Sequence, residues 1–254
     1  MGKASLFLRK MARQVGYQIA RFGQTPIGID PVRDIGRFLR GVPRPVMLDV
    51  GANTGQTIAR FRRRFPQAVV HAFEPSPTTF ATLRAGHEGV PGVHLWNVGV
   101  GSAAATMTLL ENDHPTMTSF LAPGAAAWGT IVRTTEVPVV TLDGFAAEHR
   151  LDFVHVLKSD TQGFDLEVFK GASQLLAENR VALVFFEFTF SAMYRNLPSF
   201  PEVFQLLADS NYALAAYYEP HVQDDLVGWT DFLFVSRQFY RAMRERGPGG
   251  RTIR

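Results

Sequence analysis

Short apolar runs alternate with amphipathic helical stretches along most of this 254-residue chain, and that alternation constrains its fold more than any other feature. An uninterrupted apolar run such as Val46–Val50 is typical of a strand that is buried on both faces of a parallel sheet. The helical stretches between such runs supply the crossovers that parallel pairing requires. We therefore expect an α/β protein with a doubly wound, mostly parallel sheet covered by helices on both faces.

The predicted elements follow one another in a regular order. Strands are expected at residues 46–50, 68–73, 93–97, 105–110, 137–142, 153–159, 181–188, 213–218 and 232–235, and helices at 31–39, 56–64, 77–85, 143–149, 165–177 and 200–209. A polar loop separates the fourth and fifth strands, which favours a β-hairpin inserted between the parallel units. No long helix separates the last two strands, so they can join antiparallel.

The charge of the chain is concentrated at its two ends. Residues 1–29 carry five Lys and Arg and no acid, and residues 237–254 carry six Arg and one Glu, whereas residues 30–236 carry 15 basic and 22 acidic residues. An acidic body lacks the clustered cations that bind a phosphate backbone, so nucleic acid is not an expected partner. The predicted division of the chain is a helical extension over 1–40, the α/β domain over 41–237, and a basic, flexible tail over 238–254.

The N-terminal segment combines its cations with an apolar stripe. Leu8, Met11, Val15 and Ile19 recur at helical spacing, and Arg9 lies off this stripe. Such a helix suits packing against the body of the protein, which is the commoner outcome, and it also suits a peripheral contact with an anionic membrane. No run of 18 apolar residues and no secretory signal is found, so we expect a cytoplasmic protein, with any membrane contact at the inner face.

A glycine-rich turn directly follows the first clear strand and precedes its helix. Gly51 and Gly55 allow the backbone to turn tightly and to approach a ligand closely. Asn53, between them, is the non-glycine residue type that best tolerates a left-handed backbone. Because ligands bind at the carboxyl ends of strands where the strand order reverses, this turn is the predicted centre of a binding site.

Two acids accompany this turn. Glu74 ends the second strand about twenty residues further on, the spacing at which an acid meets ribose hydroxyls. Asp49, just before the turn, would orient the glycine loop or bind the ammonium of a cofactor. The alternative for both is that they cap the turns that follow them. Their combined position favours cofactor binding.

These residues resemble the motifs of a known enzyme family. The string Leu48–Gly55 is similar to the first motif of class I S-adenosylmethionine-dependent methyltransferases, especially those of the FkbM family. Further strings resemble later motifs of that family in the same order: Phe73–Pro75, Trp96–Gly101, Val139–Asp143 and Leu157–Ala172. The resemblance implies a Rossmann-like, seven-stranded sheet with an antiparallel last strand, and S-adenosylmethionine as cofactor. Gln162 departs from the pattern, because many members carry Glu there.

Methyl transfer, which the resemblance implies, requires an aligned acceptor that loses a proton. Asp160 ends the strand at 153–159, where its carboxylate could accept that proton; alternatively it pairs with Lys158 or caps the next helix. Glu187 ends another strand and is expected to face the same cleft, where it would touch substrate or a metal ion. His114, in the inserted loop, could act as a base, although a lone loop histidine is more often solvated.

The remaining polar candidates have weaker signals. Asn97, at the end of the third strand, would meet the adenine of the cofactor or a neighbouring backbone group. Lys158, inside a strand, is expected to pair with an acid. No metal site is predicted, because the candidate acids and His114 lack a recognisable ligand spacing and the chain has no Cys. Apolar side chains in the insertion would form a lid over an apolar acceptor or pack within a hairpin: Met107, Met117, Phe120 and Trp128.

The sequence thus predicts an S-adenosylmethionine-dependent O-methyltransferase that acts on a hydroxyl of a sugar, glycolipid or natural product. A nicotinamide-dependent oxidoreductase shares the glycine loop and the acid on the second strand. That alternative is disfavoured, because position 53 is not Gly and no Tyr-x-x-x-Lys pair is present. A non-enzymatic module that binds membranes through its basic ends is the third hypothesis.

Overall fold

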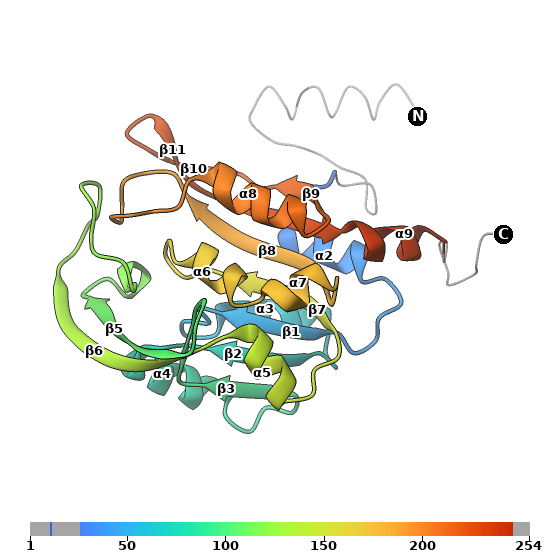
Figure 1. Cartoon of the computed structure of the whole chain (residues 1–254), viewed down its shortest axis with the longest axis horizontal. Helices are drawn as coiled ribbons and strands as arrows, with labels where there is room; N and C mark the ends of the chain where they lie inside the picture. Colours follow the sequence, from blue (N-terminus) through green and yellow to red (C-terminus); the bar gives the residue numbers. More distant parts are fainter. Residues whose placement is uncertain (1–10, 12–25, 246–254) are drawn as a thin grey trace.

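The structure is a computed structural model that describes residue 11 and residues 26–245. A twisted central sheet lies between two layers of helices, and a second, smaller sheet projects from one end of it (Figure 1). Apart from residue 11, the predicted helix over the apolar stripe of residues 8–22 lies outside the described residues, and so does the end of the predicted tail, 246–254. None of the described helices is both long and apolar enough to span a bilayer.

The central sheet contains the seven expected strands and one short addition. Its order is β3-β2-β1-β7-β8-β11, and both β9 and β10 pair with the far edge of β11. The strands from β3 to β8 run parallel, whereas β11 is antiparallel to β8 and to β9, as the sequence predicts. The bounds are β1 (Val46–Val50), β2 (Val69–Phe73), β3 (Val93–Trp96), β7 (Val154–Ser159), β8 (Val181–Thr189), β9 (Tyr212–Tyr217), β10 (His221–Gln223) and β11 (Leu226–Ser236).

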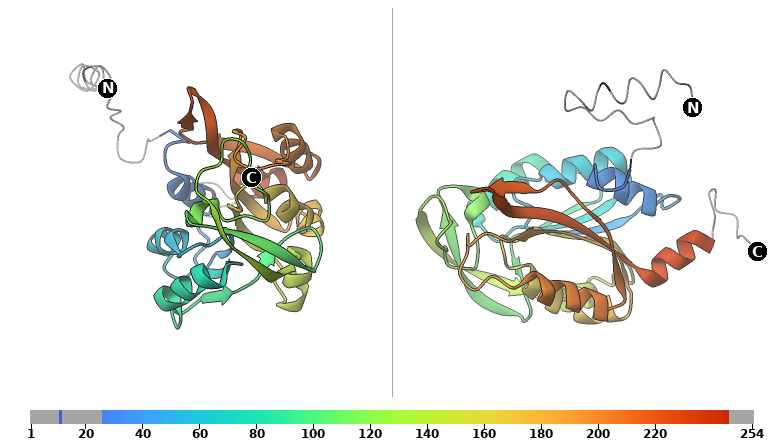
Figure 2. Two further views of the ribbon diagram at one scale, coloured as in Figure 1. Left: turned by 90° about the vertical axis from the view of Figure 1, so that its left-hand side faces the viewer. Right: turned by 90° about the horizontal axis from the view of Figure 1, so that it is seen from above.

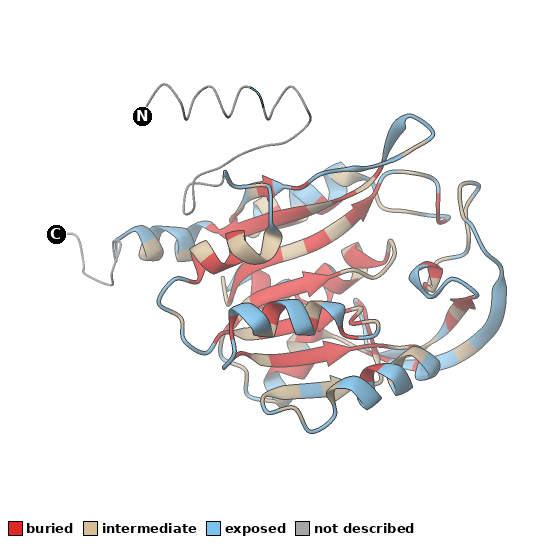
Figure 3. Cartoon of the chain, turned by 180° about the vertical axis from the view of Figure 1, so that it is seen from behind, coloured by how far each residue is buried: buried red, intermediate tan, exposed pale blue. Residues whose placement is uncertain are grey.

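Helices cover both faces of this sheet, and each face has its own apolar core (Figures 2 and 3). Leu48 and Phe186 belong to one core, and Met47 and Leu183 belong to the other, because neighbouring residues of a strand point to opposite faces. The helices on the first face are α5 (Leu142–Glu148), α6 (Asp165–Lys170), α7 (Ser173–Ala177) and α8 (Phe200–Asp209). Those on the second are α2 (Pro31–Phe38), α3 (Gln56–Arg64), α4 (Pro77–His87) and α9 (Arg237–Glu245).

The insertion forms a three-stranded sheet of order β4-β6-β5. Strands β5 (Ala105–Asn112) and β6 (Ile131–Val140) make the predicted antiparallel hairpin, and β4 (Gly99–Val100) pairs with β6 in parallel. The short 3₁₀-helix η1 (Pro115–Met117) lies in the loop between β5 and β6. Figure 3 shows that this hairpin is far more exposed than the central strands. It stands beside the end of β1, which carries the glycine loop, and the end of β2, which carries Glu74 (Figure 1).

Two elements differ from the sequence prediction. The single helix expected over 165–177 is divided at Gly171 into α6 and α7, where a side-chain Cβ would stand 2.0 Å from the carbonyl oxygen of Gly101. The predicted tail begins instead as α9, because Phe239 and Met243 pack against the second core. The expected helix over 31–39 is present as α2, and Asp30 caps it, since its side chain accepts from the amides of the first turn.

Candidate active site

The glycine loop leaves β1 where the strand order reverses, since β1 lies between β2 and β7. Gly51, Asn53 and Gly55 all have a left-handed backbone, with φ of +73°, +49° and +94°. A Cβ on Gly51 would lie 1.9 Å from the carbonyl oxygen of Asp160, so only glycine fits between these two loops. The loop therefore brings the end of β1 against the end of β7.

Glu74, at the end of β2, is bound to the same loop. Its carboxylate accepts hydrogen bonds from the backbone amides of Asn53 (2.9 Å) and Ser76 (3.0 Å). Burial raises the pKa of Glu74 to about 7, although these two amides oppose the rise. A carboxylate has about four acceptor positions, so further donors can still bind to it. Glu74 thus caps the turn that follows it, which is the alternative considered above. It also keeps acceptor positions for hydrogen bonds from a ligand in the cavity.

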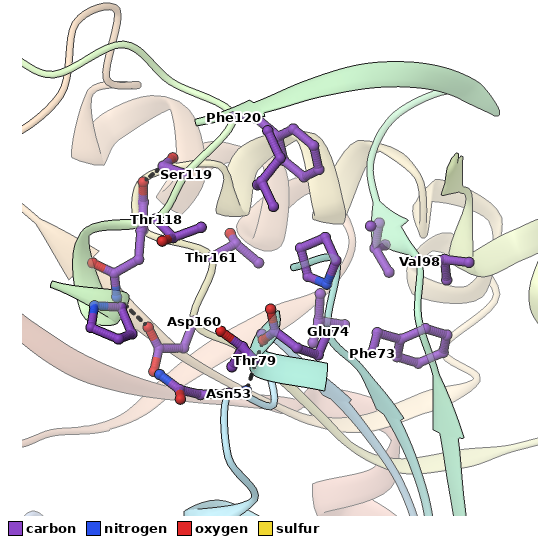
Figure 4. A pocket seen from close by; sticks show the side chains of 18 of the residues that line it. Asn53, Phe73, Glu74, Thr79, Val98, Thr118, Ser119, Phe120, Asp160 and Thr161 are labelled. Carbon is purple, nitrogen blue, oxygen red and sulfur yellow. Dashed lines mark hydrogen bonds between the residues drawn. The ribbon is translucent and has the colours of Figure 1, made fainter. Parts of the chain in front are cut away.

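A cavity opens between the ends of β1, β2 and β7 and the inserted hairpin (Figure 4). Gly51, Asn53 and Glu74 line one part of it, and Asp160 lines another. Phe120, from the insertion, closes the opposite side in Figure 4. Three of the predicted cofactor-binding residues and the first predicted catalytic residue therefore share one space. The other lining residues are Val50, Phe73, Pro75, Thr79, Val98, Gly99, Val100, Leu109, Pro115, Thr116, Thr118, Ser119, Thr161 and Gln162.

Lys158 connects the cofactor loop with the acid at the end of β7. Its ammonium lies 3.1 Å from Asp49 and 3.7 Å from Asp160, and it donates to the carbonyl oxygen of Gly51 (2.8 Å). Burial alone would lower the pKa of Lys158, but the two carboxylates outweigh it and raise this pKa. Asp49 is fully buried and does not line the cavity, so it acts on the glycine loop through Lys158.

A second set of contacts holds Asp160 from its other side. The amide nitrogen of Gln162 donates to Asp160 (2.9 Å), and the hydroxyl of Tyr194 donates to the amide oxygen of Gln162 (3.0 Å). Ser119 of the insertion also donates to the backbone oxygen of Gln162 (2.9 Å). Tyr194 is buried, and nothing in the sequence around it pointed to this role. A Glu at position 162 would place a second carboxylate beside Asp160.

Glu187 lies next to this set but does not line the cavity. Its register partner on β11 is Asp231. Burial, together with the neighbouring carboxylates of Asp160 and Asp231, raises the pKa of Glu187 to about 9, so this side chain keeps its proton at neutral pH. Burial also raises the pKa of Asp231 to about 6. Because Glu187 does not line the cavity, the structure gives no support to the expectation that this residue touches substrate.

Two further candidates are not among the residues that line the cavity. Asn97 donates to the backbone oxygens of Glu74 (2.8 Å) and Pro75 (3.1 Å), so it holds the turn after β2, the second of the two roles considered for it. His114 is exposed and is not among the lining residues. Among the described residues, no group of three or more His, Asp or Glu side chains could hold a metal ion.

The apolar side chains of the insertion were expected either to cover an acceptor or to pack within the hairpin, and different side chains take each position. Phe120 faces the cavity, whereas Met117 packs with Met193 and Tyr194. Trp128 lies 6.0 Å from Trp229, measured between ring centroids. The insertion is therefore a packed wall of the site.

A parallel sheet of this strand order, in which the antiparallel last strand β11 lies between β8 and β9, is the class I methyltransferase fold. The family model of the methyltransferase FkbM domain matches residues 49–214, so the chain belongs to the FkbM family of S-adenosylmethionine-dependent methyltransferases. The resemblance found in the motifs is thus confirmed.

Curated relatives share modest identity with the chain. It is 22% identical to the 2-O-methyltransferase NoeI of Sinorhizobium fredii over 73% of this chain and 79% of that protein. It is 31% identical to the 31-O-demethyl-FK506 methyltransferase FkbM of Streptomyces tacrolimicus over 56% of this chain and 53% of that protein. It is 28% identical to methyltransferase 1 of Beauveria bassiana over 49% of this chain and 57% of that protein. The chain thus spans little more than half the length of two of these three relatives.

Solved structures similar to the chain have low sequence identity. An rRNA methylase from Streptococcus thermophilus has a TM-score of 0.48 at 11% identity, and the match covers 84% of this chain and 99% of that one. Precorrin-6y C5,15-methyltransferase from Geobacter metallireducens has a TM-score of 0.44 at 12% identity, with 80% and 86% covered.

The residues around the cavity fit the cofactor of this family. Glu74 lines the cavity and keeps acceptor capacity for the two ribose hydroxyls. The backbone of the loop between Gly51 and Gly55 can approach a ligand closely. Gly51, Asn53 and Glu74 would therefore hold the adenosyl part of S-adenosylmethionine.

Proposed function

We propose that this chain methylates a hydroxyl group on a sugar, a glycolipid or another natural product. The observation that carries the proposal is the position of Asp160, whose carboxylate lines the same cavity as Glu74 and the glycine loop. When bound, S-adenosylmethionine supplies an activated methyl group. The protein then has to orient the acceptor and remove one proton from its hydroxyl.

Asp160 is suited to accept this proton. Its side chain is 37% exposed, so an acceptor can reach it from the cavity. Lys158 and Gln162 lie on either side of it and fix its direction. Asp160 would thus serve as the general base of the reaction.

The names of two relatives support an oxygen acceptor. NoeI is a 2-O-methyltransferase, and FkbM is a 31-O-demethyl-FK506 methyltransferase. The apolar wall that Phe120 contributes also suits an acceptor with a nonpolar part.

Isothermal titration calorimetry tests the cofactor half of this proposal. We expect S-adenosylhomocysteine to bind at a single site and a nicotinamide dinucleotide not to bind. A Glu74→Gln variant should bind S-adenosylhomocysteine at least tenfold more weakly, because a charge-assisted hydrogen bond contributes about 1.5–3 kcal/mol. Binding of the dinucleotide in place of S-adenosylhomocysteine would support the oxidoreductase alternative and refute the proposal.

Methyl transfer tests the acceptor half. The protein would be incubated with methyl-labelled S-adenosylmethionine and a lipid and glycan extract from cells that lack the gene. We expect the label in an ether-linked methyl group, identified by mass spectrometry of the products. Label found only on nitrogen, or in added RNA, would contradict the choice of a hydroxyl acceptor.

We also propose that the basic ends make a peripheral contact with anionic membranes. The support comes from an apolar groove lined by Ile27, Phe38 and Leu214, with Arg237 and Arg241 beside them. Ile27, near the start of the continuous described chain, and residues of α9, near its end, line this groove together. Cations around an apolar surface suit an anionic lipid layer. Flotation with phosphatidylglycerol vesicles should recover the protein, and phosphatidylcholine vesicles should not.

A further inference from the structure

Glu111, on strand β5 of the inserted hairpin, accepts hydrogen bonds from residues of the hairpin and also from a residue outside it. It is only 4% exposed. Its carboxylate accepts from Arg133 through two nitrogens (2.7 and 2.8 Å) and from Thr135 (2.5 Å), both on β6. It also accepts from the hydroxyl of Ser76 (2.7 Å), which lies outside the insertion, directly after the end of β2. Glu111 therefore connects the hairpin to the turn that carries Glu74.

Ser76 occupies a central position in this connection. While its hydroxyl donates to Glu111, its backbone amide donates to the carboxylate of Glu74 (3.0 Å). The same hydroxyl accepts from the amide of Thr79 (3.3 Å) and so caps α4. Ser76 is 2% exposed, so it has little freedom to change position. Ser76 therefore links Glu111 to the amide that binds Glu74.

We propose that Glu111 is a positioning residue that acts through Ser76 to fix the direction of the Glu74 carboxylate toward the ribose of the cofactor. This inference rests on the proposed function, because it assumes that the adenosyl group binds at Glu74. It assigns to the inserted hairpin a part in cofactor recognition as well as in forming the wall of the cavity.

Charge explains why a carboxylate occupies this position. An ionised oxygen makes a shorter and stronger hydrogen bond to a hydroxyl than a neutral one does. The guanidinium of Arg133 compensates the charge of Glu111 across the hairpin, and it also contacts Thr78 at the start of α4. Two strands of the hairpin and the first turn of α4 thus form one hydrogen-bonded unit around Ser76.

The discrimination between adenosine and 2′,3′-dideoxyadenosine tests the inference, because the two probes differ only in the ribose hydroxyls. Their dissociation constants would be measured by ligand-observed NMR titration. In Ser76→Ala we expect the affinity for adenosine to fall about tenfold, the equivalent of one hydrogen bond to a charged group, while the affinity for dideoxyadenosine stays within about twofold. Glu111→Gln should reduce the same discrimination, by about threefold, because an amide oxygen still accepts from Ser76 but lacks the charge.

A control variant on the same hairpin separates positioning from a general structural role. Thr108 donates to Glu136 on the exposed side of β5 and β6, away from Ser76. Glu136→Gln should leave both dissociation constants unchanged. If Glu111→Gln does not fold, Ser76→Ala decides the question alone.

The outcomes distinguish this inference from the proposed function. If Ser76→Ala binds both probes as the unchanged protein does, or loses both to the same extent, Glu111 does not position the ribose-binding carboxylate. If the unchanged protein itself binds neither S-adenosylhomocysteine nor adenosine, the proposed function fails and the inference fails with it.

Discussion

At the scale of single residues, the site depends on one buried cation. Lys158 lies within 4 Å of Asp49 and Asp160 and also bonds to the glycine loop. The sequence predicts that a lysine inside a strand has an acidic partner, and the structure gives it two. The pairing with Asp160 was one of the alternatives considered for that acid, and it is present. The pairing with Asp49 could not be predicted, because it depends on the parallel register of β1 against β7, where Asp49 stands opposite Lys158. That register is a long-range property.

Replacement of the proposed base should separate chemistry from cofactor binding. Asp160→Asn keeps the size of the side chain and an oxygen that accepts from Gln162, but it removes the charge that takes up the proton. We expect turnover to fall by a factor of about 10² to 10⁴, and the affinity for S-adenosylhomocysteine to stay within about threefold. Asp209→Asn, an exposed acid on α8, serves as the control and should change neither quantity. Unchanged turnover in Asp160→Asn would exclude this residue as the base.

The raised pKa of Glu74 predicts that cofactor affinity depends on pH. Burial brings this pKa to about 7, and only the ionised carboxylate offers every oxygen to the ribose hydroxyls. Because binding favours the ionised form, the affinity should fall as the pH decreases through 7. Between pH 8 and pH 6 we expect about a tenfold loss in affinity for S-adenosylhomocysteine, measured by calorimetry. Glu74→Gln should remove this dependence, and an equal slope in the variant would assign it to another group.

At the scale of elements, the order of strands and helices could be predicted because buried parallel strands need apolar runs and the helices need an apolar stripe. Strands β4 and β10 were missed, since two or three residues carry no measurable period. The break between α6 and α7 was missed for another reason. It depends on the carbonyl oxygen of Gly101, a residue 70 positions earlier in the chain. Likewise, the pairing of Glu111 with Arg133 depends on a hairpin register that no turn motif fixes.

Two glycine substitutions should change stability in opposite directions. Gly171→Ala places a methyl group 2.0 Å from the carbonyl oxygen of Gly101, so the backbone must shift, at a cost of about 1–3 kcal/mol. Gly86→Ala lies in α4 with nothing within 4 Å of the new Cβ, and alanine favours the helix there by up to about 1 kcal/mol. The free energies of unfolding would be measured in urea. A neutral Gly171→Ala would show that the close approach does not cause the helix break.

At the scale of the whole molecule, the excess of positive charge and the core residues lie in different parts of the chain. The described segment 26–245 supplies residues to both main cores that flank the central sheet. That segment contains 18 Lys and Arg and 23 Asp and Glu, so its formal charge is −5, against +3 for the full chain. The fold therefore belongs to an acidic body, and the net positive charge belongs to the ends. An acidic body has no electrostatic attraction to an anionic membrane.

Truncation to residues 26–245 should separate these two properties. Because the truncated chain keeps both cores, including the packing of Phe239 and Met243 from α9, we expect its melting temperature to stay within about 3 °C of the full chain. Its affinity for S-adenosylhomocysteine should also be unchanged, since no residue of the cavity is removed. Binding to phosphatidylglycerol vesicles should be lost, because the segment carries net negative charge.

The same truncation decides between the two roles open to the apolar stripe of residues 8–22. If the stripe packs on the body, its removal exposes apolar surface and lowers the melting temperature by more than 3 °C, whatever happens to vesicle binding. If it contacts a membrane, the melting temperature stays constant and only vesicle binding is lost. A truncated chain that still binds the vesicles would place the contact on the body itself, where Arg237 and Arg241 border the groove, and Arg237→Glu with Arg241→Glu would then be expected to abolish it.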